Sequence, residues 1–447
     1  MEVKNTFFLC VALALVVSCS KDDARQNDPI SVETEILAEV STFGGSKNES
    51  GESVIATTDG GYAILGFTQS MDGDVTGKQN DSYDYWVLKF NSESELEWQK
   101  TYGGSGGDKG FDIIQTQDGG YALIGSSFSN DQDVSQNNGA EDFWLVKLDA
   151  LGELSWEKSY GYSGVDSGLS VIQTNDGGYF ISGVLDVTAS GGEGNSKGVL
   201  HAGGDYWGLK LSATGAIEWS KYYGGFFTDT PYSAVQTDDN GFILVGSSDS
   251  VDTDISNNIG DYDFWVVKIS EFGNLEWEKS FGGTEIDEAR AIIKIPDGNY
   301  VIAGDTRSFN TDVSSNNGLA DVWIIKITPN GTLLWENTIG GSSFDVARDI
   351  TITQDGGFLL AGSSRSSDGD ITRNNGQNDA LVVKVNSQGQ LEWHKTIGGN
   401  NIDFAYGVAE LNNNTIIVVG ESSSSDQDIT ENKGFTDLLH IKIDLKE

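Results

Sequence analysis

The stretch DFWLVKLDALGELSWEKSYG, residues 142–161, is the clearest copy of a unit that recurs along most of the chain. An aromatic or aliphatic residue followed by glycine ends each copy, at Phe43, Tyr102, Tyr160, Tyr223, Phe281, Ile339 and Ile397. The intervals between these markers are 59, 58, 63, 58, 58 and 58 residues. An aspartate five residues before a lysine recurs with the same period, at Asp84, Asp142, Asp205, Asp263, Asp321, Asp379 and Asp437. This regularity indicates a repeat architecture.

Each copy contains the same order of strand and turn signals. Residues 110–116, GFDIIQT, form a strand pattern, and residues 117–120 predict a hairpin turn, which we assign to type I′ because it contains Asp-Gly. YALIGSS then returns as a second strand. After a polar loop come a third strand, DFWLVKLD, a turn, and a fourth strand, LSWEKSY. Four short antiparallel strands in each unit are typical of a β-propeller blade.

The two ends of the chain predict how the ring closes. The last copy stops after its third strand, whereas the segment Glu35–Phe43 precedes the first copy and aligns with fourth strands, with Glu39 at the tryptophan position. We therefore predict an all-β fold, a seven-bladed β-propeller over residues 34–447, in which the N-terminal strand completes the last blade. All 11 tryptophans fall at third-strand or fourth-strand positions. We expect them to pack between blades, which leaves none as a platform for sugar stacking.

The N-terminus predicts an exported lipoprotein. Residues 7–17 are an apolar segment of signal-peptide length, and Val16-Val17-Ser18-Cys19 resembles a bacterial lipobox. We predict a signal peptide over residues 1–18, lipidation at Cys19, and an anchor with a flexible tether over residues 19–33. The following Ser20-Lys21-Asp22-Asp23 resembles the export signal of Bacteroidota lipoproteins, which implies a lipid-anchored, surface-exposed protein of the outer membrane. An ordinary secretory signal that ends near a cysteine is the alternative.

The repeat unit resembles the bacterial β-propeller repeat (SBBP-like) found in lipoproteins of Bacteroidota type. The residues that carry this resemblance in one copy are Asp142, Lys147, Asp149, Gly152, Leu154, Trp156, Tyr160, Asp166 and Asp176-Gly177-Gly178-Tyr179. The family implies secreted or surface propellers and brings no catalytic residue. Part of the unit is also similar to blades of pyrroloquinoline-quinone enzymes, but the cofactor-specific cysteines of those enzymes are absent here.

Composition excludes several kinds of partner. The formal charge of −41 disfavours nucleic acid and anionic lipid head groups, so we expect membrane contact only through the lipid anchor. Cys10 and Cys19 are the only cysteines, and the three histidines are far apart in sequence. A disulfide within the propeller and a His-rich metal site are therefore not expected. We expect a monomer.

A ring of carboxylates lies in loops on one face of the predicted propeller. One carboxylate follows each glycine pair, at Glu49, Asp108, Asp166, Asp229, Asp287, Asp345 and Asp403. This ring either holds a cation or caps local backbone amides, and its presence in every copy favours capping.

A second acidic pattern, Asp-x-Asp, occurs in most of the long loops of the same face. The pairs are Asp72 and Asp74, Asp131 and Asp133, Asp252 and Asp254, Asp368 and Asp370, and Asp426 and Asp428, with Asn310 and Asp312 as a variant. These aspartates are candidate calcium ligands, with solvated turn residues as the alternative. Calcium is the one cofactor that the sequence leaves open.

Departures from the repeat indicate a specific binding site. The third copy has a five-residue insertion between Asp186 and Gly204. The next glycine-pair loop reads GGFFTDTPY where other copies are small or polar. We place the candidate ligand site on these two segments, with these residues: His201, Glu193, Phe226, Phe227 and Tyr232. Neutral drift in a long surface loop is the alternative.

We expect a cell-surface binding module for a glycan or a protein partner. A polysaccharide-degrading enzyme on the same face, either a lyase or an endoglucanase-like glycoside hydrolase, is the alternative, and a purely structural envelope protein is a third hypothesis. Catalysis has less support, because the sequence shows no Ser/His/Asp arrangement, HExxH motif or phosphate-binding glycine loop. No catalytic residue is therefore assigned.

Overall fold

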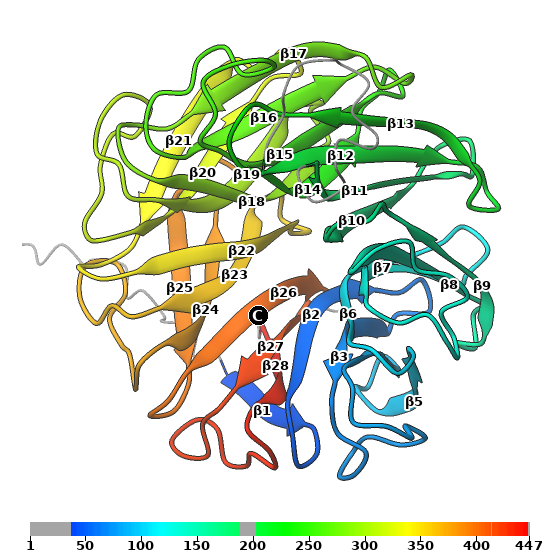
Figure 1. The fold of residues 1–447 in the computed structure, drawn as a ribbon. Helices are drawn as coiled ribbons and strands as arrows, with labels where there is room; N and C mark the ends of the chain where they lie inside the picture. The colour runs from blue at the N-terminus through cyan, green and yellow to red at the C-terminus, as the bar shows by residue number, and fades with distance from the viewer. Residues whose placement is uncertain (1–36, 188–202, 413, 446–447) are drawn as a thin grey trace, which may run out of the picture. The chain divides into compact units, whose positions relative to one another are not determined.

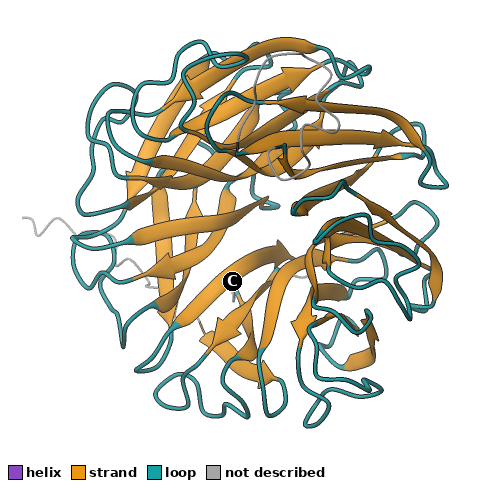
Figure 2. Cartoon of the chain, in the orientation of Figure 1, coloured by secondary structure: helices purple, strands orange, loops and turns teal. Residues whose placement is uncertain are grey.

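The computed structural model describes residues 37–187, 203–412 and 414–445. The described residues form 28 β-strands in seven four-stranded antiparallel sheets. The sheets are arranged as the blades of a propeller around a central axis, and Figure 2 shows strands joined by loops and turns. The predicted seven-bladed propeller is therefore confirmed. Among these residues there is no helix long and apolar enough to cross a membrane.

Each blade contributes one strand to each of four concentric positions (Figure 1). The innermost strands are β2 (Glu49–Ala56), β6 (Asp108–Gln115), β10 (Asp166–Gln173), β14 (Asp229–Gln236), β18 (Asp287–Lys294), β22 (Asp345–Ile352) and β26 (Asp403–Glu410). The second strands are β3 (Tyr62–Thr68), β7 (Tyr121–Ser127), β11 (Tyr179–Asp186), β15 (Phe242–Ser248), β19 (Tyr300–Thr306), β23 (Phe358–Ser364) and β27 (Thr415–Ser422). The third strands are β4 (Asp84–Phe90), β8 (Asp142–Leu148), β12 (Gly204–Leu211), β16 (Asp263–Ile269), β20 (Asp321–Ile327), β24 (Asp379–Val385) and β28 (Asp437–Asp444). The outermost strands are β5 (Leu96–Tyr102), β9 (Leu154–Tyr160), β13 (Ile217–Tyr223), β17 (Leu275–Phe281), β21 (Leu333–Ile339), β25 (Leu391–Ile397) and β1 (Leu37–Phe43). We number the blades 1 to 7 from β2 onward.

The ring closes through β1, as the sequence predicts. β1 pairs antiparallel with β28, from Leu37 opposite Asp444 to Phe43 opposite Leu438. The last blade therefore has the strand order β1-β28-β27-β26, so the two ends of the propeller unit meet in one sheet. Without β1, the backbone of β28 would be an unpaired sheet edge.

The hydrophobic core consists of layers between neighbouring blades. One cluster joins Leu65 and Val87 of blade 1 to Leu123 and Val146 of blade 2. The third-strand tryptophans belong to these layers, and Trp144 packs edge-on against a tyrosine of the preceding blade with ring centroids 4.7 Å apart. The blades thus bury each other's faces, because a single four-stranded sheet cannot cover both of its own faces.

The hairpin between the first two strands of a blade differs from the predicted type I′ turn. In blade 1 the amide of Gly60 donates to the carbonyl of Thr57, and the amide of Thr57 donates to the carbonyl of Gly61. Within this turn, only Gly60 has a positive φ, at 89°. This is a three-residue loop, a type I turn followed by a residue in the left-handed region, whereas type I′ needs positive φ at both central residues. The aspartate instead acts through its side chain, which accepts a hydrogen bond from the amide of Gly61 at 3.0 Å.

Every innermost strand contains a β-bulge at the same place. In β2, Gly51 lies opposite Gly66 and Ser53 opposite Leu65, so Glu52 is the extra residue. The strands approach closely here, because a Cβ on Gly66 would lie far inside van der Waals contact with the carbonyl oxygen of Ser50. A glycine in the second strand is therefore required, and each of the seven copies has one.

This close approach leads to a first prediction. Gly66→Ala should lower the free energy of unfolding by about 3 kcal/mol, because the added methyl group meets backbone that cannot rotate away. Gly107→Ala is the matched control, since a Cβ at Gly107 would have no heavy atom within 4 Å. Urea unfolding of both variants measures the difference. Equal stability of the two variants would contradict the bulge geometry.

Candidate functional site

The ring of seven carboxylates has a structural role in the loops. Asp108 is fully buried and accepts hydrogen bonds from the amide of Gly104 at 2.7 Å and from the hydroxyl of Ser129 at 2.7 Å. Asp287 binds Gly283 and Ser308 in the same way in blade 5. These bonds are the backbone capping that the repetition in every copy favours.

The first aspartate of each Asp-x-Asp pair accepts a hydrogen bond from the preceding glycine-pair loop. Asp131 accepts one from the amide of Ser105 at 2.7 Å, and Asp368 accepts one from the amide of Ser342 at 2.7 Å. The same bond is made by Asp72 at 2.8 Å, by Asp252 at 3.0 Å and by Asp426 at 2.8 Å. These aspartates therefore shape the loops through backbone amides.

The second aspartate of each pair accepts a hydrogen bond from the amide of the first glycine in the same glycine pair. The distance is 3.0 Å for Asp74, 3.2 Å for Asp133, 3.3 Å for Asp254, 3.2 Å for Asp370 and 3.4 Å for Asp428. Asp74 also pairs with Lys433 at 3.1 Å, and Asp428 pairs with Arg373 at 3.1 Å. One carboxylate oxygen of each second aspartate is thus directed at protein groups.

The hydrogen bonds of these aspartates bear on their two predicted roles, calcium ligand or turn residue. Across the described ranges no group of three or more His, Cys, Asp or Glu side chains could hold a metal ion. The two aspartates of a pair tie the long loop to the glycine-pair loop, which is the turn role that the sequence left as the alternative. Calcium binding by Asp72, Asp74, Asp252, Asp254, Asp368, Asp370 and their equivalents stays a prediction, and the hydrogen bonds of these loops do not require it.

The five candidate ligand residues do not all lie at one place. His201 and Glu193 lie outside the described residues. Phe226 and Phe227 are 46% and 50% exposed on the loop face, with ring centroids 5.7 Å apart. Tyr232 instead lines the axial channel, which those two phenylalanines do not line. Tyr232 is therefore the candidate residue that indicates the channel, and not the loops, as a ligand site.

The axial channel opens into a cavity of about 580 Å³. Its walls are formed by Glu52, Phe67, Lys109, Phe111, Leu169, Tyr232, Arg290, Arg348, Tyr406 and Glu421. A narrower space of about 130 Å³ shares most of these residues and extends to Asp112 and Asp349. The bulge of each innermost strand supplies one wall residue, and these seven are Glu52, Phe111, Leu169, Tyr232, Arg290, Arg348 and Tyr406. We call these seven residues the bulge ring.

Two neighbouring arginines give one side of the bulge ring a positive charge. Arg290 donates from Nη2 to Glu288 at 2.9 Å, and its guanidinium lies 4.1 Å from the ring centroid of Tyr232. Its buried Nε has no hydrogen-bond partner among the described residues. Burial lowers the pKa of Arg348, and the charge of Arg290 lowers it further, against the opposing effect of Asp305.

The two blades that follow Arg348 around the ring carry two carboxyl groups, Glu421 on blade 7 and Glu52 on blade 1. Burial raises the pKa of Glu52 to about 7, against a hydrogen bond from Ser50, and the charge of Glu421 adds to the increase. Tyr406 donates from its hydroxyl to Glu421 at 3.0 Å. Burial and this carboxylate hold the pKa of Tyr406 well above its usual range, so the phenol remains a hydrogen-bond donor. The channel therefore brings carboxyl groups and a phenol close to the arginines.

Below the bulge ring, two aspartates join the innermost strands of adjacent blades. Asp112 accepts a hydrogen bond from the amide of Val171 at 2.9 Å, and Asp349 accepts one from the amide of Val408 at 2.9 Å. Burial raises the pKa of Asp112 to about 6 and that of Asp349 to about 7. These groups hold the walls of the channel in place and form its polar floor.

Sequence reasoning missed the bulge ring, although the sequence contains a signal for it. Each member stands three residues after the ring carboxylate, and five residue types occupy this position in seven copies. The preceding position is small in every copy, at Gly51, Gly110, Gly168, Pro231, Ala289, Ala347 and Ala405. A small residue in every copy, followed by a residue that differs between copies, indicates the bulge position. The side chain at that position is not packed within the blade and faces the channel.

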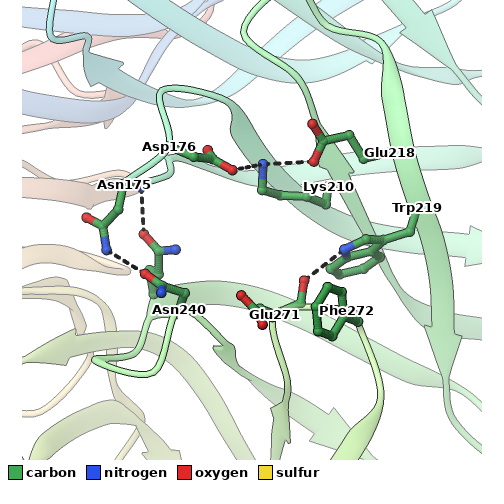
Figure 3. A pocket seen from close by; sticks show the side chains of 9 residues that line it. Asn175, Asp176, Lys210, Glu218, Trp219, Asn240, Glu271 and Phe272 are labelled. Atoms are coloured by element: carbon green, nitrogen blue, oxygen red, sulfur yellow. Dashed lines mark hydrogen bonds and ion pairs between the residues drawn. The ribbon is translucent and has the colours of Figure 1, made fainter.

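A second cavity, of about 560 Å³, lies between blades 3 and 4 near the hairpin turns (Figure 3). Trp219 packs against Phe242 as predicted, but it also lines this groove, so not every tryptophan is confined to blade contacts. Its polar groups bind one another: the indole N–H of Trp219 donates to the carbonyl of Glu271 at 3.0 Å, and Lys210 pairs with Asp176 at 2.9 Å. This groove therefore offers fewer free polar groups than the channel.

No protein-family model and no curated protein sequence matches this chain. Several solved structures are similar to it at low identity. The WD40 domain of Pan2 from Neurospora crassa has a TM-score of 0.48 and 7% identity, with 93% of this chain and 97% of that chain covered. Sqt1 from Chaetomium thermophilum has a TM-score of 0.43 and 11% identity, with 86% and 83% covered. A gluconolactonase from Xanthomonas campestris has a TM-score of 0.38 and 10% identity, with 91% and 89% covered. The channel residues are therefore interpreted from their own chemistry.

Proposed function

We propose that this chain is a surface-exposed lipoprotein of the outer membrane whose propeller binds a glycan, with one end of the glycan in the axial channel. The bulge ring is the observation that carries this proposal. The seven positions have equivalent backbone surroundings, so packing alone would favour one repeated residue. Instead they bring aromatic, acidic and basic side chains into one cavity, which is the usual composition of a ligand pocket.

The loop face supplies a second contact surface for a longer ligand. Exposed phenylalanines stand on several of its loops, at Phe128, Phe226, Phe227, Phe309 and Phe435. Each is about half exposed or more, which is unusual for so large an apolar side chain. An acidic face with exposed Phe226 and Phe227 favours a binding module over a structural component.

The anchor supports the proposed location. Cys19 in its lipobox context is the residue that would carry the lipid, and the polar residues 20–33 would separate the propeller from the membrane. Stable anchoring needs more than one acyl chain, which a bacterial lipoprotein modification at such a cysteine would provide. Labelling of intact cells with a membrane-impermeant reagent, followed by detection of this chain, tests surface exposure.

The glycan proposal is tested by filling the channel. The chain from Glu35 to Glu447 keeps every described strand and is screened by thermal unfolding against neutral and acidic oligosaccharides. A bound glycan at one hundred times its dissociation constant should stabilise the protein by about 2.7 kcal/mol. Leu169→Trp should abolish this stabilisation, because Leu169 lines the cavity. Leu151→Trp is the matched control, since Leu151 is 71% exposed in a turn.

The outcome of this screen separates the hypotheses. Stabilisation that survives Leu169→Trp would place the glycan outside the channel. No stabilisation by any glycan, together with binding of a protein from the cell envelope, would replace the glycan with a protein partner.

A polysaccharide-degrading enzyme is the second candidate function. Glu52, whose pKa is about 7, faces the same cavity as Glu421, and a carboxyl group with a raised pKa next to a second carboxylate is the arrangement that general acid catalysis uses. The same incubations, analysed for shorter or unsaturated products, distinguish cleavage from binding.

A further inference from the structure

The arginines of this protein are concentrated in one part of the propeller. The sequence contains six, and all except Arg25 fall between residues 290 and 373, in blades 5 and 6. The whole chain has a formal charge of −41, so this is a local departure from a strongly acidic background. Two of these arginines, Arg290 and Arg348, reach the axial channel from adjacent innermost strands.

The channel neutralises this pair only in part. Glu288 binds only Nη2 of Arg290, whose buried Nε has no partner in the described part of the chain. Within the same described ranges no carboxylate forms an ion pair with Arg348, although the charge of the buried Asp305 acts on it against that of Arg290. Two adjacent guanidinium groups repel each other, and an unpaired buried charge is costly. Their retention in a channel therefore indicates an anion that binds between them.

We propose that Arg290 and Arg348 form a carboxylate-binding subsite and that the glycan ends in a sugar acid, such as a uronic acid residue. This inference rests on the proposed function, because it names the chemical class of the glycan end that enters the channel. Guanidinium groups match carboxylates with paired, charge-assisted hydrogen bonds.

The rest of the cavity favours a carboxylated sugar over a more highly charged ligand. Glu52, Glu421 and Asp305 lie around the arginines, so a ligand with two negative charges would be repelled more than one with a single charge. Phe111 and Leu169 offer apolar surface to the carbon face of a sugar ring. The carboxyl groups and the hydroxyl of Tyr406 can bind sugar hydroxyls.

The test compares three oligosaccharides of equal length by isothermal titration calorimetry. One ends in glucuronic acid, one in glucose and one in glucose 6-phosphate. The uronic acid probe should bind at least about tenfold more tightly than the other two, because a lost hydrogen bond to a charged group costs about 10- to 100-fold in affinity. Arg348→Met should weaken binding of the uronic acid probe by a similar factor and weaken binding of the glucose probe by a clearly smaller one.

Arg373→Met is the matched control variant. It removes the same charge from the same region, but Arg373 is 53% exposed and pairs with Asp428 at 3.1 Å outside the channel lining. Its affinity for the uronic acid probe should equal that of the unmodified protein. Arg348→Met should also melt no lower than the unmodified protein, because it removes an unpaired charge, whereas a purely structural arginine would leave the protein less stable.

The remaining outcomes each overturn the inference. Equal binding of the glucose and uronic acid probes would leave the proposed glycan function intact and remove the carboxylate subsite. Equal or tighter binding of the phosphate probe would replace the carboxylate with another anion. Binding of a peptide with a free C-terminus, but not of its amide, would replace the sugar. Failure of all probes would contradict the proposed function itself.

Discussion

A chain that begins at Gly44 is expected to lose the folded propeller, although it lacks only β1 and the residues before it. β1 pairs with β28 along its whole length. Phe43 packs against Phe90 with ring centroids 5.6 Å apart, and Ala38 and Val40 cover the core of the last blade. We expect the free energy of unfolding to fall by more than about 5 kcal/mol, which approaches the whole stability of many domains. Circular dichroism and thermal unfolding measure this loss.

The control is a chain that begins at Glu35, which should melt like the mature protein. The peptide of residues 35–43, added to the chain from Gly44, should restore β-structure, because an exposed strand edge accepts an extended peptide. A scrambled peptide of the same composition should not restore it. Melting of the shorter chain within a few degrees of the control would show that closure by β1 is dispensable.

The closure of the ring by β1 was predictable because dividing the sequence into repeats leaves one strand unassigned at the start and one strand missing at the end. Six complete copies, a copy without its fourth strand and one unassigned strand at the start add up to a closed ring. The alignment even gave the register: Glu39 stands opposite Lys442, as Trp98 stands opposite Lys89 in blade 1. Repetition supplies this information, because an error in one copy is corrected by the other six.

The turn type was wrong because the prediction considered only the Asp-Gly pair. Thr57 donates from its hydroxyl to Asp59 and also accepts from Gly60 through its carbonyl oxygen. The aspartate is thus held by its side chain at negative φ, and only the glycine needs the left-handed region. The threonine two residues before the aspartate was the missing signal.

The channel was not predicted because its functional side chains lie on strands, whereas the departures from the repeat that indicated a binding site lie in loops. A bulge shifts the side-chain alternation by one residue, so a channel-facing position cannot be read from a simple two-residue period. Arg348 and Glu52 therefore looked like ordinary strand residues. The glycine of the second strand, at Gly66 and its equivalents, contained the necessary information, because it is required only where the bulge brings two strands together.

Stability should be greatest near pH 4 and should fall as the pH rises toward 8. Carboxyl groups between the blades are the cause. Burial raises the pKa of Asp263 to about 7, against a hydrogen bond from Ile259, and the charge of Asp287 adds to the increase. Burial likewise raises the pKa of Asp229 to about 7 and that of Asp321 to about 6. The folded state therefore holds protons that the unfolded chain releases above about pH 4.

The direction of the effect follows from these shifts. A group with a raised pKa contributes its full stability below the unfolded value and loses it as the pH rises through the folded value, here between about 4 and 7. The hairpin aspartates act in the opposite direction. Partial burial raises the pKa of Asp239, but hydrogen bonds from Thr237, Gly241 and Lys268 outweigh it and lower the pKa to about 2. This second contribution is lost as the pH falls from about 4 toward 2, which leaves the maximum between the two windows.

Two variants with the same chemical change should therefore move stability in opposite directions at pH 8. Asp263→Asn should raise the free energy of unfolding by about 2 kcal/mol, because it removes a buried charge beside Asp287. Its new amide can donate where Oδ1 of Asp263 has no partner among the described residues. Asp239→Asn should lower the free energy by about 1 kcal/mol or less, since its carboxylate is largely exposed and pairs with Lys268.

Urea unfolding at pH 5 and pH 8 measures both, and the gain from Asp263→Asn should shrink at pH 5, where the native carboxyl is already neutral. A gain that is equal at both pH values, or a loss at pH 8, would show that the buried carboxyl pairs do not set the pH dependence.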